Sequence, residues 1–337
     1  MNAFFNLSLV PRPKLSLDEY ETRESCRSMR VLITGSAGML GSALSHSLSE
    51  SKVHEVLPLT RQDLDLRDKH EFQKHLKNFR PEVVIHAAAK VGGIQANIAS
   101  PFEFLASNLQ IDSSVISASL ENGVPELLYI GSSCMYPKDY RQPLVESDIL
   151  QGPLELTNEG YALAKITGAK LCEYATRSHG VSYKTIIPSN LYGPGDNFRT
   201  GSSHLLASVI RKVHETKVTK SREIDVWGSG NARREFTYIA DLAQWVGSQI
   251  GSMADLPSML NVGIGVDYSV NDFYNAALRA LNVEAELVHD ITKPEGMQAK
   301  LMDSTLAREK HSWSPKIDLE AGIKETYKWF LSNSEEK

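Results

Sequence analysis

The sequence predicts an α/β protein, with a doubly wound parallel sheet covered by helices on both faces and a smaller mixed α/β lobe. Two observations predict this class. Short apolar runs rich in Val, Ile and Leu alternate with longer segments of helical spacing, as expected for strands that are buried on both sides. A glycine-rich turn also separates the first apolar run from the first helical segment. The 337 residues suffice for one large domain or two smaller ones.

Most of the expected strands precede residue 190. They are 30–35, 55–60, 82–89, 126–133 and 183–189. Apolar residues at helical spacing predict helices between them, at 68–79, 101–122 and 158–179. Beyond about residue 190, loops rich in glycine and proline become denser and the elements shorter. The expected elements there are helices at 203–216, 238–250, 269–281 and 317–332, and a strand at 284–289.

The chain divides into three expected parts. Residues 1–28 have a short apolar start, two prolines and mixed charges, without the order of features of a signal peptide, and we expect a flexible arm of unknown role. Residues 29–190 form most of the larger domain. Residues 191–337 form most of the smaller lobe, with segments that return to the larger domain.

Composition excludes several classes of function. A net charge of −5 gives no basic footprint for nucleic acid, and no apolar run approaches the roughly 20 residues of a membrane span. The three cysteines, at 26, 134 and 172, have neither metal-ligand nor disulfide-framework spacing. We therefore expect no metal, no nucleic-acid or membrane partner, and a location in the reducing cytoplasm.

Three glycines follow the first expected strand. Gly35, Gly38 and Gly41 form the pattern G-x-x-G-x-x-G in the stretch ITGSAGMLGSALSHSL. Glycines let the backbone turn tightly and approach a pyrophosphate, which binds at the N-terminus of the next helix. The motif predicts a Rossmann-type dinucleotide site that also includes Met39 and Leu40; a plain tight turn is the alternative.

Residues after the second and third strands would contact the rest of the dinucleotide. Arg61 follows the second strand, where an arginine accommodates the 2′-phosphate of NADP and an acidic residue would favour NAD. NADPH/NADP+ is therefore the expected cofactor, unless Arg61 is an ordinary surface residue. Asp65 is a candidate for binding the adenine amino group. Ala87 and Ala88 are small enough to let the cofactor lie close to the sheet.

A tyrosine and a lysine four residues apart indicate acid–base chemistry. Tyr161 and Lys165 share one face of an expected helix, and a nearby ammonium lowers a tyrosine pKa from its usual value of about 10. Tyr161 would then donate a proton to a substrate carbonyl as hydride arrives. Ser132 ends the fourth strand, where ligands of open α/β sheets bind. Tyr-x-x-x-Lys alone is common, and a surface pair is the alternative.

Six stretches carry a resemblance to a known family. They are AAAKVGGIQAN (87–97), GSSCMYP (131–137), LELTNEGYALAKITGAKLCE (154–173), PSNLYGPGDNF (188–198), VWGSGNARREF (226–236) and NVGIGVD (261–267). The chain resembles the extended short-chain dehydrogenases/reductases, and most closely the branch that epimerises and reduces GDP-4-keto-6-deoxy-D-mannose. The similarity runs from about Met29 to the C-terminus and leaves out the 28-residue arm.

The resemblance implies a catalytic group of five side chains. They are Ser132, Tyr161, Lys165, Cys134 and His204. In the family, a cysteine and a histidine at the last two positions are the base and the acid of epimerisation. Without the resemblance, Cys134 would be read as a core thiol and His204 as a helix cap or core residue. The two positions could also persist in a protein that has lost epimerisation.

The resemblance also implies a site for a GDP-sugar. Its residues would be Asn190, Lys212, Trp227, Arg234 and Lys300, while Pro188, Asn190 and Leu191 would contact the cofactor. Lys212 stands where the family can have an arginine, so it keeps the charge without the bidentate fork. Ala37 stands where some relatives have an arginine for the 2′-phosphate.

The expected reaction is inversion of C3 and C5 of GDP-4-keto-6-deoxy-D-mannose, followed by NADPH-dependent reduction at C4. The nearest alternative is the same chemistry on a related GDP-4-keto sugar, either the 3,6-dideoxy precursor of colitose or a heptose. A non-catalytic dinucleotide-binding protein and a structural scaffold are alternatives from other classes. The resemblance further implies a homodimer, paired through the long helices at 101–122 and 158–179.

Overall fold

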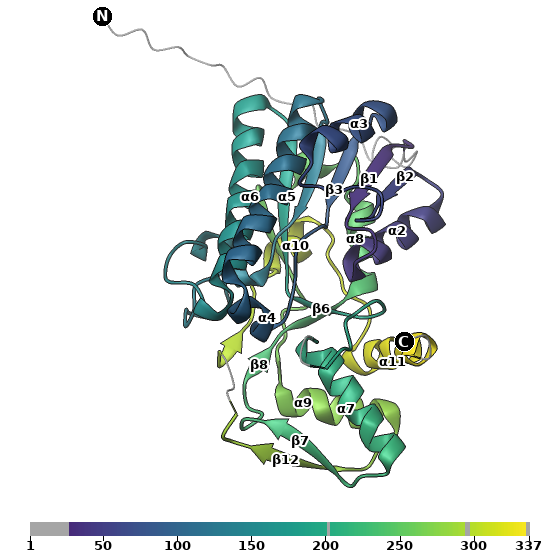
Figure 1. Ribbon diagram of the computed structural model, residues 1–337, viewed down its shortest axis with the longest axis vertical. Helices are drawn as coiled ribbons and strands as arrows, with labels where there is room; N and C mark the ends of the chain where they lie inside the picture. The colour runs from purple at the N-terminus through teal and green to yellow at the C-terminus, as the bar shows by residue number, and fades with distance from the viewer. Residues whose placement is uncertain (1–26, 201–202, 294–296, 335–337) are drawn as a thin grey trace, which may run out of the picture.

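The computed structural model describes residues 27–200, 203–293 and 297–334. Residues 1–26 of the predicted arm lie outside this range. In Figure 1 the parallel sheet and its helices form the upper part of the molecule, and a smaller lobe lies below them.

A six-stranded sheet organises the larger part. Its strands are β1 (Arg30–Thr34), β2 (Glu55–Leu59), β3 (Val83–His86), β4 (Glu126–Ile130), β5 (Ser182–Pro188) and β10 (Met259–Val262). They pair in the order β10-β5-β4-β3-β1-β2, and every pairing is parallel. Because the order reverses between β1 and β3, the loops that follow these two strands diverge there and leave a crevice.

Helices cover both faces of this sheet (Figure 1). On one face lie α3 (Lys69–Phe79), α5 (Pro101–Glu121) and α6 (Glu159–His179), and on the other α2 (Met39–Ser51), α8 (Ile239–Ser248) and α10 (Thr305–Lys310). Each strand supplies both cores: Leu32 packs toward the first group of helices, whereas Val31 and Ile33 pack toward the second. This alternation explains why the strands read as continuous apolar runs.

The smaller lobe has its own core. Its helices are α7 (Leu205–Thr219), α9 (Val270–Leu281) and α11 (Leu319–Ser334). Its strand pairs are β7 (Glu223–Trp227) with β12 (Glu286–Asp290), and β6 (Asn190–Tyr192) with β9 (Phe236–Tyr238). A third small sheet joins β8 (Arg233–Arg234) to β11 (Tyr268–Ser269) and β13 (Ala299–Lys300).

The predicted fold class is confirmed, with differences in the short elements. The strands expected to run to residues 89 and 133 end at His86 and Ile130, because the residues beyond them turn into the loops at the crevice. The sequence did not indicate the helices α4 (Ile94–Ala99) and α10, since six residues are too few to establish a period. It indicated a short element at the segment MLNVGIG, which contains β10, but did not place that element in the six-stranded sheet. No helix of the described ranges is long and apolar enough to cross a membrane.

Candidate active site

The glycine loop lies at the crevice between β1 and β3. Gly35 has a φ of +73°, and a Cβ on it would come within 2.6 Å of the Ala88 Cα. A Cβ on Gly41 would lie 2.1 Å from the Gly35 carbonyl oxygen. Both glycines are therefore required for α2 to begin directly against the loop, with Ala87 and Ala88 on its other side.

The start of α2 fits the pyrophosphate of a dinucleotide. Gly38 precedes the helix without a side-chain cap, and the first turn holds no acidic residue. The first amide groups of a helix lack intrahelical partners and attract anions. The buried hydroxyl of Ser36 in the same loop also has no hydrogen-bond partner. Met39 and Leu40 supply the first two helical amides, so these residues would hold the pyrophosphate.

The predicted adenosine contacts lie beyond β2. Arg61 is exposed there, as is Asp65. The Asp65 carboxylate accepts hydrogen bonds from the guanidinium of Arg67, at 2.9 Å from Nε, and these bonds lower the pKa of Asp65 to about 2. The sequence did not single out Arg67, because only the conformation of the turn brings its guanidinium to the Asp65 carboxylate. Asp65 is thus already bonded within the chain, whereas Arg61 projects from the surface beside it.

The structure brings Ser132, Tyr161 and Lys165 together at the end of β4. The Ser132 Oγ accepts the Cys134 amide at 3.2 Å, which caps a single helical turn, Ser133–Met135. Tyr161 lies in the first turn of α6. Contrary to the expectation that a neighbouring ammonium lowers the Tyr161 pKa, burial and the nearby Cys134 and Asp112 raise it, and a hydrogen bond with Ser132 opposes that rise.

Lys165 lies one turn further along α6 and is 2% exposed. Its Nζ donates to the Ile130 carbonyl oxygen at 2.9 Å and lies 6.0 Å from the centre of the Tyr161 ring. Burial lowers the Lys165 pKa, and the negative charge of Asp112 opposes this.

Cys134 is half-buried, and its Sγ accepts a hydrogen bond from Asn158 Nδ2 at 3.2 Å. Cys172 shows the contrast, because it is fully buried in the core and burial raises its thiol pKa. Cys134 packs at the edge of the same core but, unlike Cys172, is only partly buried and bonds a polar side chain. Asn158, the residue before α6, was missed by sequence reasoning although it lies within one of the motifs quoted above.

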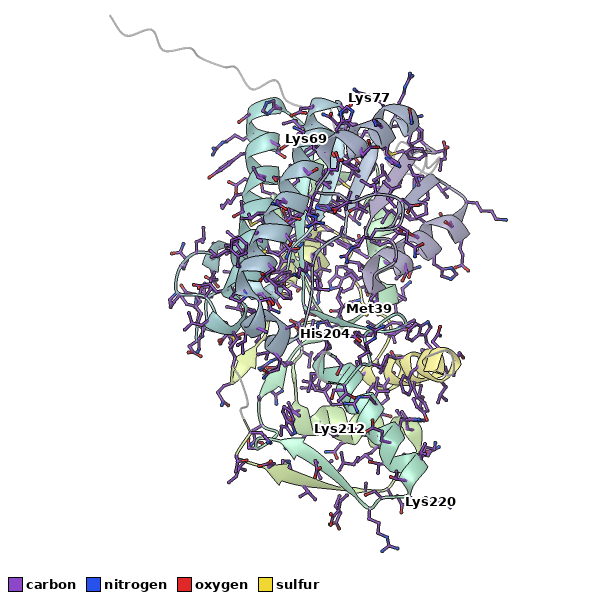
Figure 2. The ribbon with its side chains drawn as sticks, viewed as in Figure 1. Met39, Lys69, Lys77, His204, Lys212 and Lys220 are labelled. Carbon is purple, nitrogen blue, oxygen red and sulfur yellow. The ribbon has the colours of Figure 1, made fainter. Side chains whose placement is uncertain are left out.

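His204 is the residue before α7, yet its side chain does not cap that helix. Its Nδ1 lies 3.4 Å from the Asp196 Oδ1, and the two side chains are 47% and 3% exposed. The hydrogen bond to Asp196 raises the His204 pKa against the opposing effect of burial. In Figure 2, His204 and Met39 lie near the boundary between the two lobes. Asp196 was also missed, because nothing local marks it as the partner of a residue eight positions away.

Two of the predicted substrate residues lie side by side next to the catalytic segment. Lys300 is paired with Arg234 across β13 and β8, and its Nζ donates to the Ser133 carbonyl oxygen at 3.2 Å. Burial lowers the pKa of Arg234. Asn190 in β6 donates to the Glu235 carbonyl oxygen at 3.0 Å. The predicted cofactor contacts Pro188 and Leu191 lie on either side of Asn190, with Pro188 buried and Leu191 half-buried.

The other two substrate residues form a separate group on the smaller lobe. Trp227 ends β7 and is 58% exposed. Lys212 lies two turns beyond His204 on α7 (Figure 2), 5.9 Å from the Trp227 ring centre, and donates to the Asp225 carbonyl oxygen at 2.6 Å. Lys293 approaches the same ring at 5.7 Å and was not predicted.

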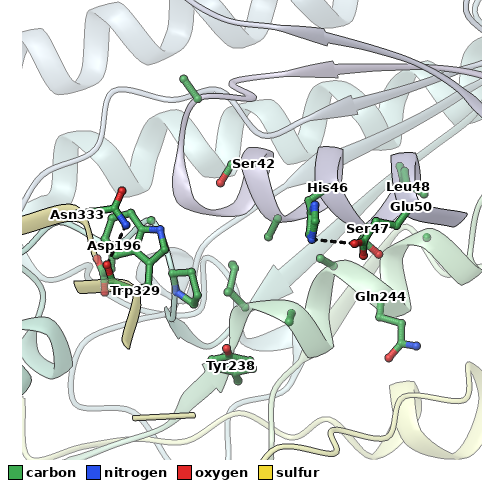
Figure 3. Close-up of a pocket in the computed structure, with 18 of the residues that line it drawn as sticks. Ser42, His46, Ser47, Leu48, Glu50, Asp196, Tyr238, Gln244, Trp329 and Asn333 are labelled. Atoms are coloured by element: carbon green, nitrogen blue, oxygen red, sulfur yellow. Dashed lines mark hydrogen bonds and ion pairs between the residues drawn. The ribbon is translucent and has the colours of Figure 1, made fainter. Parts of the chain in front are cut away.

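A groove of about 1780 Å³ opens between α2, α8 and α11 (Figure 3). Asp196 and Tyr238 line it, as do His46 and Trp329, but Ser132, Tyr161, Lys165 and Cys134 do not. Its size does not make it the active site. The titratable groups with an acid–base arrangement lie at the carboxyl ends of the strands, where the loops at the crevice converge. In the part of the chain that the structure describes, no cluster of three or more His, Cys, Asp or Glu residues could hold a metal ion.

Comparison with known proteins identifies the family of the chain. The model of the NAD dependent epimerase/dehydratase family matches residues 31–263. The chain is 44% identical over 306 residues to a protein named GDP-L-colitose synthase from Yersinia pseudotuberculosis, covering 90% of this chain and 98% of that relative. It is 42% identical over 309 residues to a GDP-L-fucose synthase from Azorhizobium caulinodans, covering 92% and 98%.

A solved structure gives the same result for the fold. It is a GDP-D-glycero-L-gluco-heptose synthase from Campylobacter jejuni in the presence of NADPH, with a TM-score of 0.81 and 29% identity over 91% of this chain and 99% of that chain. The family match, the two curated relatives and the glycine loop at the crevice lead to one conclusion: the chain is an enzyme of the NAD-dependent epimerase/dehydratase family.

Proposed function

We propose that the protein is a GDP-L-fucose synthase, which inverts C3 and C5 of GDP-4-keto-6-deoxy-D-mannose and then reduces C4 with NADPH. The observation that carries this proposal is the position of Cys134. Its thiol lies beside the Ser132–Tyr161–Lys165 group, half-buried and held by Asn158. A simple reductase needs no second acid–base group there. The Azorhizobium relative named GDP-L-fucose synthase supports the same reaction.

Epimerisation would use the cysteine and the histidine on opposite faces of the sugar. The C4 ketone acidifies the hydrogens at C3 and C5, so the Cys134 thiolate removes one as a proton and leaves an enolate. The His204 imidazolium then returns a proton to the opposite face, and exchange with solvent restores both groups. Asp196 raises the pKa of His204 and so favours the charged form that this step needs. Ser132 and Tyr161 would donate hydrogen bonds to the developing charge on the C4 oxygen.

Reduction would use the second group. The hydride for C4 would come from NADPH, which the glycine loop and the start of α2 would hold. Tyr161 donates its phenolic proton to the C4 oxygen, and the Lys165 ammonium stabilises the resulting tyrosinate. Arg234, Lys300 and Lys212 supply the positive charge that would hold the nucleotide diphosphate, and Trp227 offers an exposed ring for stacking.

A second candidate substrate is the 3,6-dideoxy analogue, which would give GDP-L-colitose. The observation that favours it is the Yersinia relative, named GDP-L-colitose synthase and 44% identical. That substrate has no hydroxyl at C3, so only C5 would need to be inverted. A GDP-heptose is the third possibility, from the name of the Campylobacter structure.

The test is NADPH oxidation with GDP-4-keto-6-deoxy-D-mannose in deuterated water, followed by NMR of the product. We expect GDP-L-fucose carrying deuterium at C3 and C5. Unlabelled GDP-D-rhamnose, or its C4 epimer, would instead mean that the protein is a reductase alone. If NADPH is not oxidised, the dideoxy and heptose substrates are tested next. Failure of all three would leave a dinucleotide-binding protein without turnover.

We also propose a homodimer, with α5 and α6 at its interface. These helices pack on each other, while Phe102 of α5 and Leu163 and Tyr174 of α6 remain exposed. Light scattering coupled to size-exclusion chromatography would measure the mass. We propose residues 29–190 as mainly the NADP domain and 191–337 as mainly the substrate lobe. The cytoplasm is the proposed compartment, because the two cysteines in the described ranges are free thiols.

A further inference from the structure

Three buried polar side chains lie near Lys165, and none of them has a role in the mechanism proposed above. His86 ends β3, Asp112 lies in the middle of α5, and Tyr129 lies in β4. Their exposed fractions are 0%, 1% and 0%. Burying polar groups so completely is costly unless they are fully hydrogen-bonded, so the contacts among them have to be accounted for.

Asp112 is the centre of this group. The Tyr129 hydroxyl donates to Asp112 Oδ2 at 2.5 Å, and His86 Nε2 lies 3.0 Å from Asp112 Oδ1. Burial lowers the His86 pKa, so the imidazole is neutral and only one of its nitrogens carries hydrogen. Thr34 Oγ1 lies 2.7 Å from His86 Nδ1. The consistent arrangement has Thr34 donating to Nδ1 and Nε2 donating to the carboxylate.

The charge of Asp112 faces the charge of Lys165. Burial alone would raise the Asp112 pKa, but the Lys165 charge and the hydrogen bonds from His86 and Tyr129 outweigh it, so the pKa is lowered and the carboxylate is ionised. Lys165 donates to a single neutral carbonyl, that of Ile130. Its Nζ lies 4.5 Å from the centre of the Tyr129 ring, whose hydroxyl bonds Asp112. Tyr129 therefore contacts both charged side chains.

The other titratable groups around Lys165 do not provide a negative charge. The groups that face it from the packed elements are His86, Asp112, Tyr129, Tyr161 and Cys172. Burial raises the pKa values of the Cys172 thiol and of both phenols, so these three are neutral near neutral pH. Among these five groups, Asp112 is therefore the one that carries a negative charge to offset the buried ammonium of Lys165.

A glycine in α6 provides an independent observation. A Cβ on Gly168 would lie 2.4 Å from the Tyr129 hydroxyl oxygen and 2.5 Å from the adjacent ring carbon. Glycine in a helix interior costs roughly 1 kcal/mol relative to alanine. Here it allows Tyr129 to lie against the helix that carries Lys165, where the ring and the hydroxyl reach their two partners.

We propose that Asp112 is the buried counter-charge that keeps Lys165 protonated, and that Tyr129 and His86 hold its carboxylate in place. Asp112 is a positioning residue: it acts on the reaction through Lys165. Because Thr34 directly precedes Gly35, the same chain of hydrogen bonds runs from the start of the glycine loop to Tyr129, whose ring lies against Lys165. The inference rests on the role proposed above for Lys165 in reduction.

The test measures the protonation of Lys165 without any sugar substrate. The full chain is labelled with [ε-13C]lysine, and the Lys165 signal is assigned by its loss in Lys165→Met. The chemical shift of this signal is then followed by NMR as the pH is raised, and the midpoint of the change is the pH at which half of Lys165 is protonated. An opposite charge favours the charged form, so Asp112→Asn should move the Lys165 midpoint to lower pH by about one unit or more. Tyr129→Phe keeps the ring but removes one bond to Asp112, and should cause a smaller shift in the same direction.

Tyr183→Phe is the matched control. Tyr183 is also fully buried, in the neighbouring strand β5, but its hydroxyl donates to the Val124 carbonyl oxygen at 3.1 Å and not to Asp112. It should leave the Lys165 midpoint unchanged. An unchanged midpoint in Asp112→Asn would overturn the proposal. If that variant does not fold, equal midpoints in Tyr129→Phe and Tyr183→Phe would overturn it.

Activity separates this proposal from the proposed function. In Asp112→Asn, the alkaline fall in the rate of NADPH oxidation should move to lower pH, in parallel with the midpoint of the Lys165 titration. If no GDP-4-keto sugar is turned over, the proposed function fails while the titration of Lys165 can still be read. If turnover is normal and the titration does not move, the counter-charge role alone fails.

Discussion

A buried aspartate acts electrostatically on each of the two basic groups of the site, yet the surroundings of these groups differ. Lys165 is 2% exposed, and burial lowers its pKa despite Asp112. The His204 side chain is 47% exposed, and Asp196 raises its pKa. The difference fits the two proposed tasks. A lysine that only stabilises a neighbouring tyrosinate can be sealed in the core, whereas a histidine that returns protons to a sugar must reach the substrate and exchange with water.

This comparison predicts that reduction and epimerisation can be separated by mutation. The largest effect is expected for Tyr161→Phe, which removes the proton donor of the proposed reduction. Reduction should fall by about 100-fold to 10,000-fold, while deuterium exchange at C3 and C5 should continue more slowly, because Ser132 alone then donates to the C4 oxygen of the enolate. Fluorescence titration with NADPH should show nearly unchanged binding. Tyr174→Phe, on the exposed face of the same helix, is the control. Normal turnover in Tyr161→Phe would remove Tyr161 from its proposed role.

Cys134→Ser should have the converse effect. A serine hydroxyl is far less acidic than a thiol, so proton removal at C3 and C5 should slow by about 100-fold or more, with a smaller effect on reduction. The measurement is deuterium incorporation by NMR. Cys172→Ala provides the control because that thiol is buried in the core, away from the crevice. If Cys134→Ser exchanges deuterium as fast as the unchanged protein, the cysteine is not the base.

Asp196→Asn tests the accessible pair by its pH dependence. The aspartate raises the His204 pKa, so its loss should lower that pKa, and His204 should lose its proton at lower pH. The alkaline limb of the exchange rate should then move to lower pH by about one unit. Asp148→Asn is a matched control, since Asp148 is also 3% exposed but bonds Arg141 instead of a histidine. Equal pH profiles in the two variants would contradict the role of Asp196.

The sequence indicated the residues of the site that lie close together along the chain, but not the distant residues that contact them. Tyr161 and Lys165 are four residues apart on one helix, and Gly35 and Gly41 belong to one short motif at the loop and the start of α2, so their spacing along the chain was enough to predict that each pair lies close together. The partners of these residues were missed because only the packing of distant segments defines them. His86 and Asp112 are separated by 26 positions and belong to a strand and a helix. The signal that could have identified them is a polar residue within an apolar run, since such a residue needs a buried partner.

The smallest effect is expected at the glycine that lets Tyr129 approach α6. In Gly168→Ala the added methyl group would meet the Tyr129 hydroxyl at 2.4 Å, so the ring must move away from both Lys165 and Asp112. We expect a loss of about 1–3 kcal/mol in the free energy of unfolding, as for overpacked cores, measured by denaturant titration. The same movement should lower the pH midpoint of Lys165 slightly.

Gly247→Ala separates this clash from the general effect of adding a methyl group to a helix. Gly247 also lies in a helix, α8, but its nearest neighbour is the end of the flexible Leu48 side chain, at 3.2 Å. Alanine has the higher helix propensity, so this change should be close to neutral or slightly stabilising. A Gly168→Ala protein as stable as Gly247→Ala, with an unmoved Lys165 midpoint, would mean that Tyr129 need not contact α6. The protonation of Lys165 would then depend on Asp112 and His86, without Tyr129.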